Sequence, residues 1–87
     1  MRELTVTIKT KTGLHARPAA LLVNTVAKAK SKVTIEKNGK VVNLKSIIAL
    51  LSLGVEENDT VTIKVDGSDE DAIIAAINRC AMENELW

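Results

Sequence analysis

The sequence lacks most of the groups from which small catalytic and binding domains are built. Its single Cys and single His exclude an internal disulfide framework and a Cys/His zinc cage, and no pattern calls for a metal ion or a cofactor. Trp87, which is expected to be either a frayed end or a contact at the rim of the core, is the only Phe, Tyr or Trp. This argues against nucleic acid as a partner, because nucleic-acid readers of this size stack bases on aromatic rings.

Long apolar segments are also missing. No stretch approaches about 18 apolar residues, and strand-like alternation begins at Leu4, so we expect neither membrane insertion nor a signal peptide. We therefore expect a reduced, cytoplasmic protein. The 87 residues are 46% apolar and 26% charged, which predicts one small globular domain over residues 1–87. Such a domain buries only about 60–65% of its unfolded surface, which leaves no room for a buried active site of several residues.

The net charge of +1 hides an asymmetry along the chain. Residues 1–45 hold ten Lys and Arg against two acids, whereas residues 46–87 hold two against nine. Two interpretations stay open. The asymmetry either marks a basic face for an acidic partner, or the folded chain interleaves the two halves.

Four strands and three helices follow from the apolar periodicity. Alternation predicts strands over residues 4–9, 33–36, 40–43 and 60–65, with Asn38-Gly39 as a type I′ turn between the second and third. Helical spacing predicts helices over 16–28, 47–53 and 69–84. Ser46 and Ser68 are the expected N-caps of the later two, and Gly54 is expected to end the short one. The inward positions of the long helices are expected to be Ala19, Leu22, Val23, Val26, Ala29, Ile73, Ile74, Ile77 and Cys80 or Ala81.

The element order β-α-β-β-α-β-α predicts an α+β fold. Strands with one polar face favour a four-stranded antiparallel sheet, with the three helices packed on its other face. This arrangement is a two-layer open-faced sandwich.

His15 is the only side chain that combines a nucleophilic nitrogen with titration near neutral pH. It lies between Gly13 and the start of a helix, where unpaired backbone N–H groups attract anions. Arg17 adds donors that match phosphate oxygens, and Pro18 occupies the first turn, where a missing N–H costs nothing. The residues alone leave two interpretations: a site for a phosphoryl group on His15, or a histidine that only caps the helix beside a solvated Arg17.

Three segments together resemble one known family. The stretch Gly-Leu-His-Ala-Arg-Pro-Ala at 13–19, Asn-Leu-Lys-Ser-Ile-Ile at 43–48 and Ser-Leu-Gly-Val at 52–55 are similar to those of HPr, the histidine-containing phosphocarriers of the phosphoenolpyruvate-dependent sugar phosphotransferase system. The resemblance spans the whole chain in length and element order. Ala49 stands where a Gly is frequent in that family, and Val6 and Ala29 stand where aromatic residues are frequent.

The resemblance implies a carrier rather than an enzyme. Enzyme I would phosphorylate His15 on Nδ1, and the phosphoryl group would pass to a sugar-specific enzyme IIA domain. Arg17 would stabilise the phosphoryl group, assisted by the backbone of the helix start at Ala16, Arg17 and Pro18. An exposed phosphoimidazole suits this role because both partners can reach it in line.

Ser46 has a structural and a regulatory interpretation, and the two are compatible. As an N-cap it would stabilise the short helix by about 1 kcal/mol. The resemblance implies instead a regulatory site of the type found in low-GC Gram-positive bacteria. There an HPr kinase/phosphorylase modifies the serine, and the product is a corepressor for catabolite control protein A.

Ile47, Ile48 and Leu51 lie on a helix too short to bury all its aliphatic side chains. They either complete the core or, as the resemblance implies, form a docking patch for enzyme I, enzyme IIA and the kinase. A transient carrier is expected to be monomeric.

Two other function classes are less well supported. A specialised regulatory or nitrogen-branch paralogue is disfavoured, because members of the Crh type lack the active histidine and nitrogen-branch members generally lack the serine motif. A small α+β module for a metabolite or RNA, with His15 as a cap, would need a pocket or base-stacking aromatic residues, and the sequence offers neither.

Overall fold

The computed structural model describes all residues, 1–87. Seven elements follow one another in the predicted order: β1 (Arg2–Thr7), α1 (Ala16–Val26), β2 (Lys32–Lys37), β3 (Lys40–Asn43), α2 (Ile47–Leu53), β4 (Thr60–Asp66) and α3 (Glu70–Asn84). No helix of this chain combines the length and the apolar character needed to cross a bilayer.

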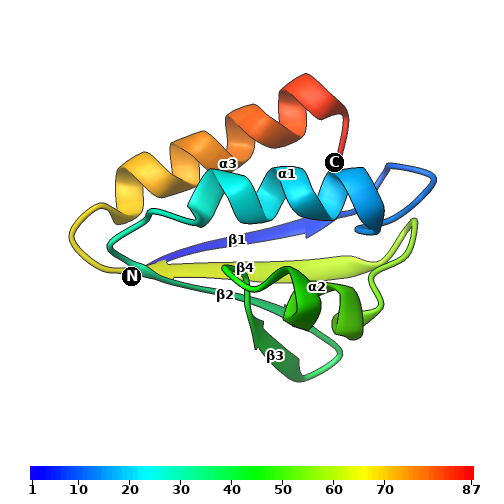
Figure 1. Ribbon diagram of the computed structural model, residues 1–87, viewed down its shortest axis with the longest axis horizontal. Helices are drawn as coiled ribbons and strands as arrows, with labels where there is room; N and C mark the ends of the chain where they lie inside the picture. The colour runs from blue at the N-terminus through cyan, green and yellow to red at the C-terminus, as the bar shows by residue number, and fades with distance from the viewer.

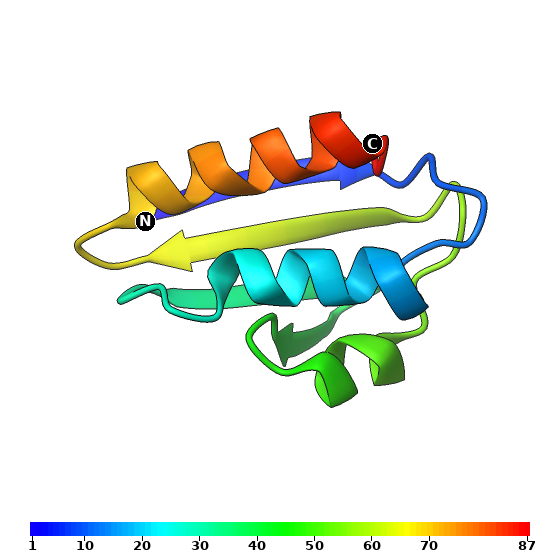
Figure 2. The same cartoon turned by 45° about the horizontal axis from the view of Figure 1, so that its top comes forward.

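The four strands form one antiparallel sheet in the order β1-β4-β2-β3. The three helices lie on the same side of that sheet, with α1 and α3 side by side and α2 beside β3 (Figures 1 and 2). The predicted α+β open-faced sandwich is therefore confirmed. Asn38 and Gly39 have φ angles of 52° and 83°, as the predicted type I′ turn between β2 and β3 requires.

A single hydrophobic core fills the space between the sheet and the helices. It contains 19 buried residues, drawn from every helix and from the inward positions of β2 and β4. The predicted inward positions of α1 are buried at Ala19, Leu22, Val23 and Val26, and Cys80 lies in the core as expected. The inward side chains of the strands and the apolar sides of the helices pack together in one interior, and this packing holds the elements in their relative positions.

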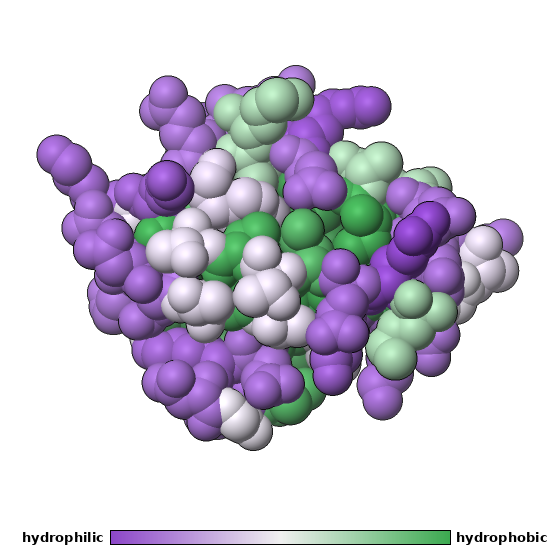
Figure 3. All heavy atoms as spheres, turned by 180° about the vertical axis from the view of Figure 1, so that it is seen from behind, coloured by the Kyte–Doolittle hydropathy of each residue, from purple (hydrophilic) through white to green (hydrophobic).

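The opposite face of the sheet is open. Threonine pairs cross from β1 to β4, with Oγ1 atoms 3.0 Å apart for Thr5 and Thr62 and 3.1 Å apart for Thr7 and Thr60. Seen from behind, this face carries weakly polar side chains, near white in colour, between charged ones (Figure 3).

Four local predictions need correction. Strand β1 spans Arg2–Thr7 rather than residues 4–9, because the N–H groups of Ile8 and Lys9 bond outside the sheet, to the carbonyls of Asp59 and Leu86. Helix α1 ends at Val26 rather than at residue 28, and Ala29 N–H bonds back to the Val26 carbonyl. The N-cap position of α3 is Asp69, not Ser68. The Asp69 carboxylate accepts hydrogen bonds from the backbone N–H groups of Lys30 and Ser31, and these bonds fix where the chain turns into the helix.

The fourth correction concerns the C-terminus. The idea of a frayed end at Trp87 is wrong, because Leu86 is buried and its N–H bonds to the Ala81 carbonyl. The Leu86 carbonyl in turn accepts from Lys9 N–H, which ties the last residues to the chain after β1. Trp87 is the rim contact of the core that the sequence left as the alternative.

The two oppositely charged halves of the chain are interleaved. Every ion pair joins a residue of 1–45 to a residue of 46–87, as in Arg2 with Asp71 and Lys37 with Asp59. Strands β2 and β4, one from each half, are neighbours in the sheet. The folded chain therefore interleaves the two halves, although only Arg2 and Lys37 among the ten Lys and Arg of residues 1–45 form ion pairs.

Candidate functional site around His15

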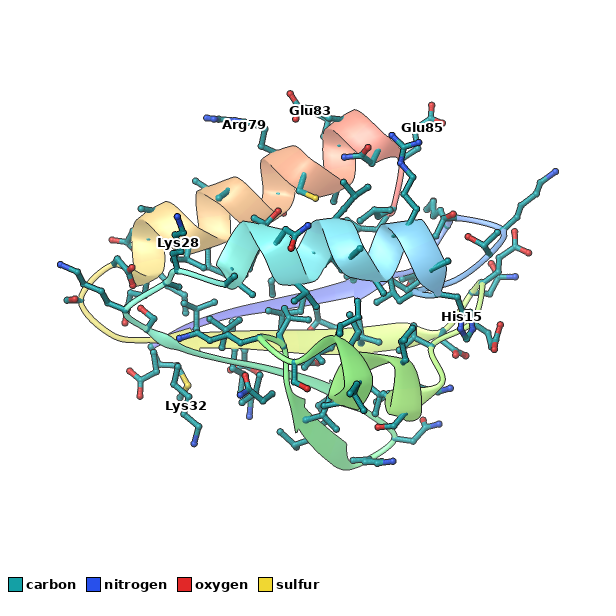
Figure 4. All side chains as sticks on the ribbon, in the orientation of Figure 1. His15, Lys28, Lys32, Arg79, Glu83 and Glu85 are labelled. Carbon is teal, nitrogen blue, oxygen red and sulfur yellow. The ribbon has the colours of Figure 1, made fainter.

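His15 occupies the N-cap position of α1 with extended backbone angles, φ −115° and ψ 160°. Its side chain makes no capping hydrogen bond, so the interpretation of His15 as a helix cap is wrong. The side chain is 41% exposed and lies at the end of the molecule opposite Lys28 and Lys32 (Figure 4). The imidazole is therefore presented at the surface rather than used to hold the helix.

The loop before His15 is anchored to the chain that precedes β4. Gly13 has φ +64°, and its N–H bonds to the Thr10 carbonyl at 3.0 Å. Leu14 is fully buried, and its N–H bonds to the Val55 carbonyl at 3.0 Å. These contacts fix the backbone on the N-terminal side of the imidazole.

The residue after the imidazole is strained. Ala16 has φ +46°, in the left-handed region. A residue with a β-carbon pays about 1–2 kcal/mol there. The strain is held in place by buried Leu14 on one side and buried Ala19 on the other.

One nitrogen of the His15 ring is engaged and the other is free. Nε2 lies 2.9 Å from Oε1 of Glu56, whereas Nδ1 has no hydrogen-bond partner in the protein. Glu56 is 41 residues away in the sequence, in the loop between α2 and β4. It is the one residue of the site that the sequence did not single out, because no local pattern links it to His15.

Arg17 and the first turn of α1 are open to an anion. The Arg17 side chain is exposed and makes no hydrogen bond or ion pair with the protein. The first turn contains no acidic residue, and Pro18 lies in it, half-buried, as predicted. The partial positive charge of the helix start and the guanidinium are thus both available beside His15.

A lysine clamps the loop that carries Glu56. Lys37 Nζ donates to the Gly54 carbonyl at 2.6 Å and lies 2.8 Å from Oδ2 of Asp59. The same Asp59 carboxylate accepts from Glu56 N–H at 2.7 Å. The hydrogen bond from Lys37, followed by that from Glu56 N–H, lowers the pKa of Asp59.

Ser46 is the N-cap of α2, as predicted. Its Oγ accepts from Ala49 N–H at 3.2 Å, and Gly54 ends the helix with φ +72°. Ser46 is half-buried, and the α2 side chains next to it are exposed.

An aliphatic surface on α2 lies next to Ser46. Ile48 is 78% exposed, Leu51 40% and Ile47 36%, whereas Leu50 and Leu53 are buried. The structure thus leaves the first three outside the core, and we call them the α2 patch. Helix α2 packs against α1, the helix whose N-cap position is His15.

The surface around His15 is not a cavity. Three hollows occur on the molecule, and neither His15 nor Arg17 lines any of them. One of them has Lys30, Lys32 and Lys45 among its seven lining residues, and Lys32 lies at the far end from His15 (Figure 4). A group attached to His15 would therefore stand in the open, accessible to another protein.

The comparisons with known proteins agree with this geometry. Residues 2–83 match the family model described as the PTS HPr component phosphorylation site. The phosphocarrier protein HPr of Mycoplasma genitalium is 42% identical over an alignment of 87 residues that covers 99% of each chain.

Two solved structures resemble the chain over almost its whole length. A crystal structure of HPr from Thermoanaerobacter tengcongensis has 46% sequence identity and a TM-score of 0.90, over 98% of this chain and 94% of that one. A histidine-containing phosphocarrier protein from Mycoplasma has 36% identity and a TM-score of 0.94, over 98% and 97%. The chain belongs to the HPr family of phosphocarrier proteins of the phosphotransferase system.

Proposed function

We propose that His15 carries the phosphoryl group on Nδ1. The observation that carries the proposal is an exposed imidazole whose Nδ1 has no partner, at a helix start beside an unpaired Arg17. Attack by Nδ1 on phosphorus needs that lone pair free and a surface that tolerates the negative oxygens. The backbone at Ala16, Arg17 and Pro18, together with the Arg17 guanidinium, supplies the second condition.

The phosphoryl group comes from enzyme I and leaves to an enzyme IIA domain. Open surface around His15 supports this order, because each partner completes the reaction centre in its own complex and then departs. The protein is then a carrier rather than an enzyme, and it acts in the cytoplasm as a monomer. It needs no cofactor or metal of its own, and both partners approach the same end of the molecule.

The α2 patch is the proposed docking surface for these partners. Ile47, Ile48 and Leu51 offer exposed aliphatic area on the helix that packs against α1. Apolar contacts at the centre of an interface with polar residues around it are typical of specific but transient association.

Ser46 is the proposed regulatory site. We infer that an HPr kinase/phosphorylase modifies it and that the phosphorylated form binds catabolite control protein A. Support comes from the Lys45-Ser46-Ile47-Ile48 sequence and from the position of Ser46 beside the α2 patch. A phosphate there adds nearly two negative charges next to apolar docking side chains, which weakens binding of enzyme I and creates a different interface.

Incubation with phosphoenolpyruvate and a bacterial enzyme I, followed by intact-mass measurement, tests the carrier function. The protein should gain one acid-labile phosphoryl group, and the His15→Ala variant should gain none. Arg17→Ala should still accept the group, but more slowly. A folded wild-type protein that gains nothing would overturn the proposal.

The regulatory proposal needs a separate assay. ATP and a Gram-positive HPr kinase should add an acid-stable phosphate to the wild type and to His15→Ala, but not to Ser46→Ala. Phosphate on another residue, or none on a folded wild type, contradicts the assignment of Ser46.

A further inference from the structure

The contact between Glu56 and His15 rests on a rigid loop rather than on a chance approach of two surface side chains. The loop between α2 and β4 is bound at several backbone points: Asn58 N–H donates to the Ile8 carbonyl, and Ile8 N–H donates to the Asp59 carbonyl, both at 2.8 Å. Lys37 clamps Gly54 and Asp59, as described above. The Glu56 backbone is therefore fixed relative to the core.

The same loop is packed directly against the chain that leads into His15. A β-carbon placed on Gly13 would come within 2.3 Å of the Val55 carbonyl oxygen and 2.8 Å of Glu56 Cα. Leu14 N–H bonds to that Val55 carbonyl. Gly13 thus allows the two backbones to touch, and this contact brings the Glu56 carboxylate to the imidazole.

We propose that Glu56 is a positioning residue for phosphoryl transfer and acts through His15. Its carboxylate accepts a hydrogen bond from Nε2–H at 2.9 Å, which fixes the tautomer whose Nδ1 lone pair is free. The inference rests on the proposed function, and it adds a residue from a distant loop to that site.

The transfer step balances without any proton movement at the ring. The Nδ1 lone pair attacks phosphorus of a phosphohistidine on the donor protein, the donor N–P bond breaks, and its electron pair returns to the donor ring. His15 keeps its Nε2 proton, so the phosphorylated ring is positively charged and faces the Glu56 carboxylate. On delivery to an acceptor nucleophile, the P–Nδ1 bond breaks and the neutral Nε2–H imidazole is restored.

Glu57 provides a matched control. It is the next residue of the same loop, it is exposed, and its side chain makes no hydrogen bond or ion pair. Removal of either carboxylate changes the net charge near His15 equally, but only Glu56 touches the ring. Any effect on the electrostatic steering of a partner should therefore appear in both the Glu56 and the Glu57 variants. An effect that acts through the His15 ring should appear only in the Glu56 variants.

The experiment compares Glu56→Ala, Glu56→Gln, Glu57→Ala and wild type by two measurements. Ring ¹⁵N shifts come from NMR of the unphosphorylated protein, in which His15 is the only histidine. Steady-state kinetics with enzyme I and phosphoenolpyruvate then give kcat and KM. Glu56→Ala loses a hydrogen bond to a charged group at a half-exposed site. We therefore expect its kcat to be about fivefold lower than that of the wild type, with KM unchanged.

The Gln variant separates geometry from charge. Its amide oxygen can still accept from Nε2–H, so Glu56→Gln should keep the wild-type ring shifts and recover part of the lost kcat. Glu56→Ala should move the ring shifts toward those of a solvent-exposed histidine, and Glu57→Ala should match wild type in the ring shifts and in kcat.

Two failures are distinguishable. If the wild type is not phosphorylated on His15, the proposed function falls. If the wild type is phosphorylated but Glu56→Ala has the same kcat as Glu57→Ala, this inference alone is overturned, whatever the ring shifts show.

Discussion

Gly13→Ala should disturb the contact on which the whole site is built. Gly13 has φ +64°, and a β-carbon there would lie 2.3 Å from the Val55 carbonyl oxygen and 2.8 Å from Glu56 Cα. Both neighbours are backbone atoms in a loop clamped by Lys37, so neither can move aside cheaply. The left-handed φ angle costs an alanine about 1–2 kcal/mol. The overpacking adds about 1–3 kcal/mol.

The free energy of unfolding should therefore fall by about 2–5 kcal/mol, a large share of the stability of a small domain. Gly39→Ala is the matched control, because Gly39 has φ +83° but a β-carbon there meets no atom within 4 Å. Its loss should be limited to the conformational part, about 1–2 kcal/mol. Urea unfolding followed by far-ultraviolet circular dichroism measures both losses.

A second readout locates the damage. The Leu14 N–H donates to the Val55 carbonyl, so its hydrogen exchange should accelerate in Gly13→Ala and not in Gly39→Ala. The His15 ring shifts should move in the direction expected for Glu56→Ala, because the loop that carries Glu56 is pushed away. Equal losses of stability in the two glycine variants would refute the claim that the backbones touch at Gly13.

Three further predictions concern other parts of the molecule. Hydrogen bonds from the Ser31 hydroxyl and from the backbone lower the pKa of Asp69, so its contribution to stability is present above the unfolded pKa and is lost as the pH falls through the folded pKa. Asp69→Asn should therefore flatten the acid side of a plot of unfolding free energy against pH, and an unchanged acid side would contradict this. Ala16→Gly should stabilise the protein by about 1 kcal/mol in the urea assay, because φ at residue 16 is +46°. Ala20→Gly, inside α1, should destabilise the protein by a similar amount, and a loss of stability in both variants would argue against strain at Ala16. Ile48→Glu should raise the KM for enzyme I about tenfold, because it places a charge in the proposed docking surface. The free energy of unfolding should stay within about 0.5 kcal/mol of the wild-type value, because Ile48 is 78% exposed. An unchanged KM would remove Ile48 from the docking surface.

Most of the fold could be predicted because its signals are local. Alternation marked the strands, and Asn38-Gly39 favoured a turn with two positive φ angles. Ser46 stood at the right distance from Gly54 to cap a short helix. The start of α3 was misplaced by one residue for a long-range reason. Ser68 and Asp69 are both good caps, and the contact of Asp69 with Ser31 decides between them.

The candidate site was predictable in part. His15 and Arg17 lie two residues apart in the sequence, so a local pattern could indicate an anion site. Glu56 could not be found in this way, because it is 41 residues from His15 in the sequence and its contact with His15 depends on the packing of Gly13 against the loop that carries it. The sequence also left open whether His15 caps α1. In the structure Nε2 contacts Glu56 and the ring makes no bond to the helix amides, and this long-range contact has no local signal.

The most direct test of phosphorylation at Nδ1 of His15 is NMR of the ¹⁵N-labelled protein after incubation with enzyme I and phosphoenolpyruvate. Nε2 is engaged by Glu56 and Nδ1 is free, so phosphorus should couple to Nδ1 of His15, and the signal should disappear when an enzyme IIA domain is added. Phosphorus bonded to Nε2, or to any residue other than His15, would contradict the account.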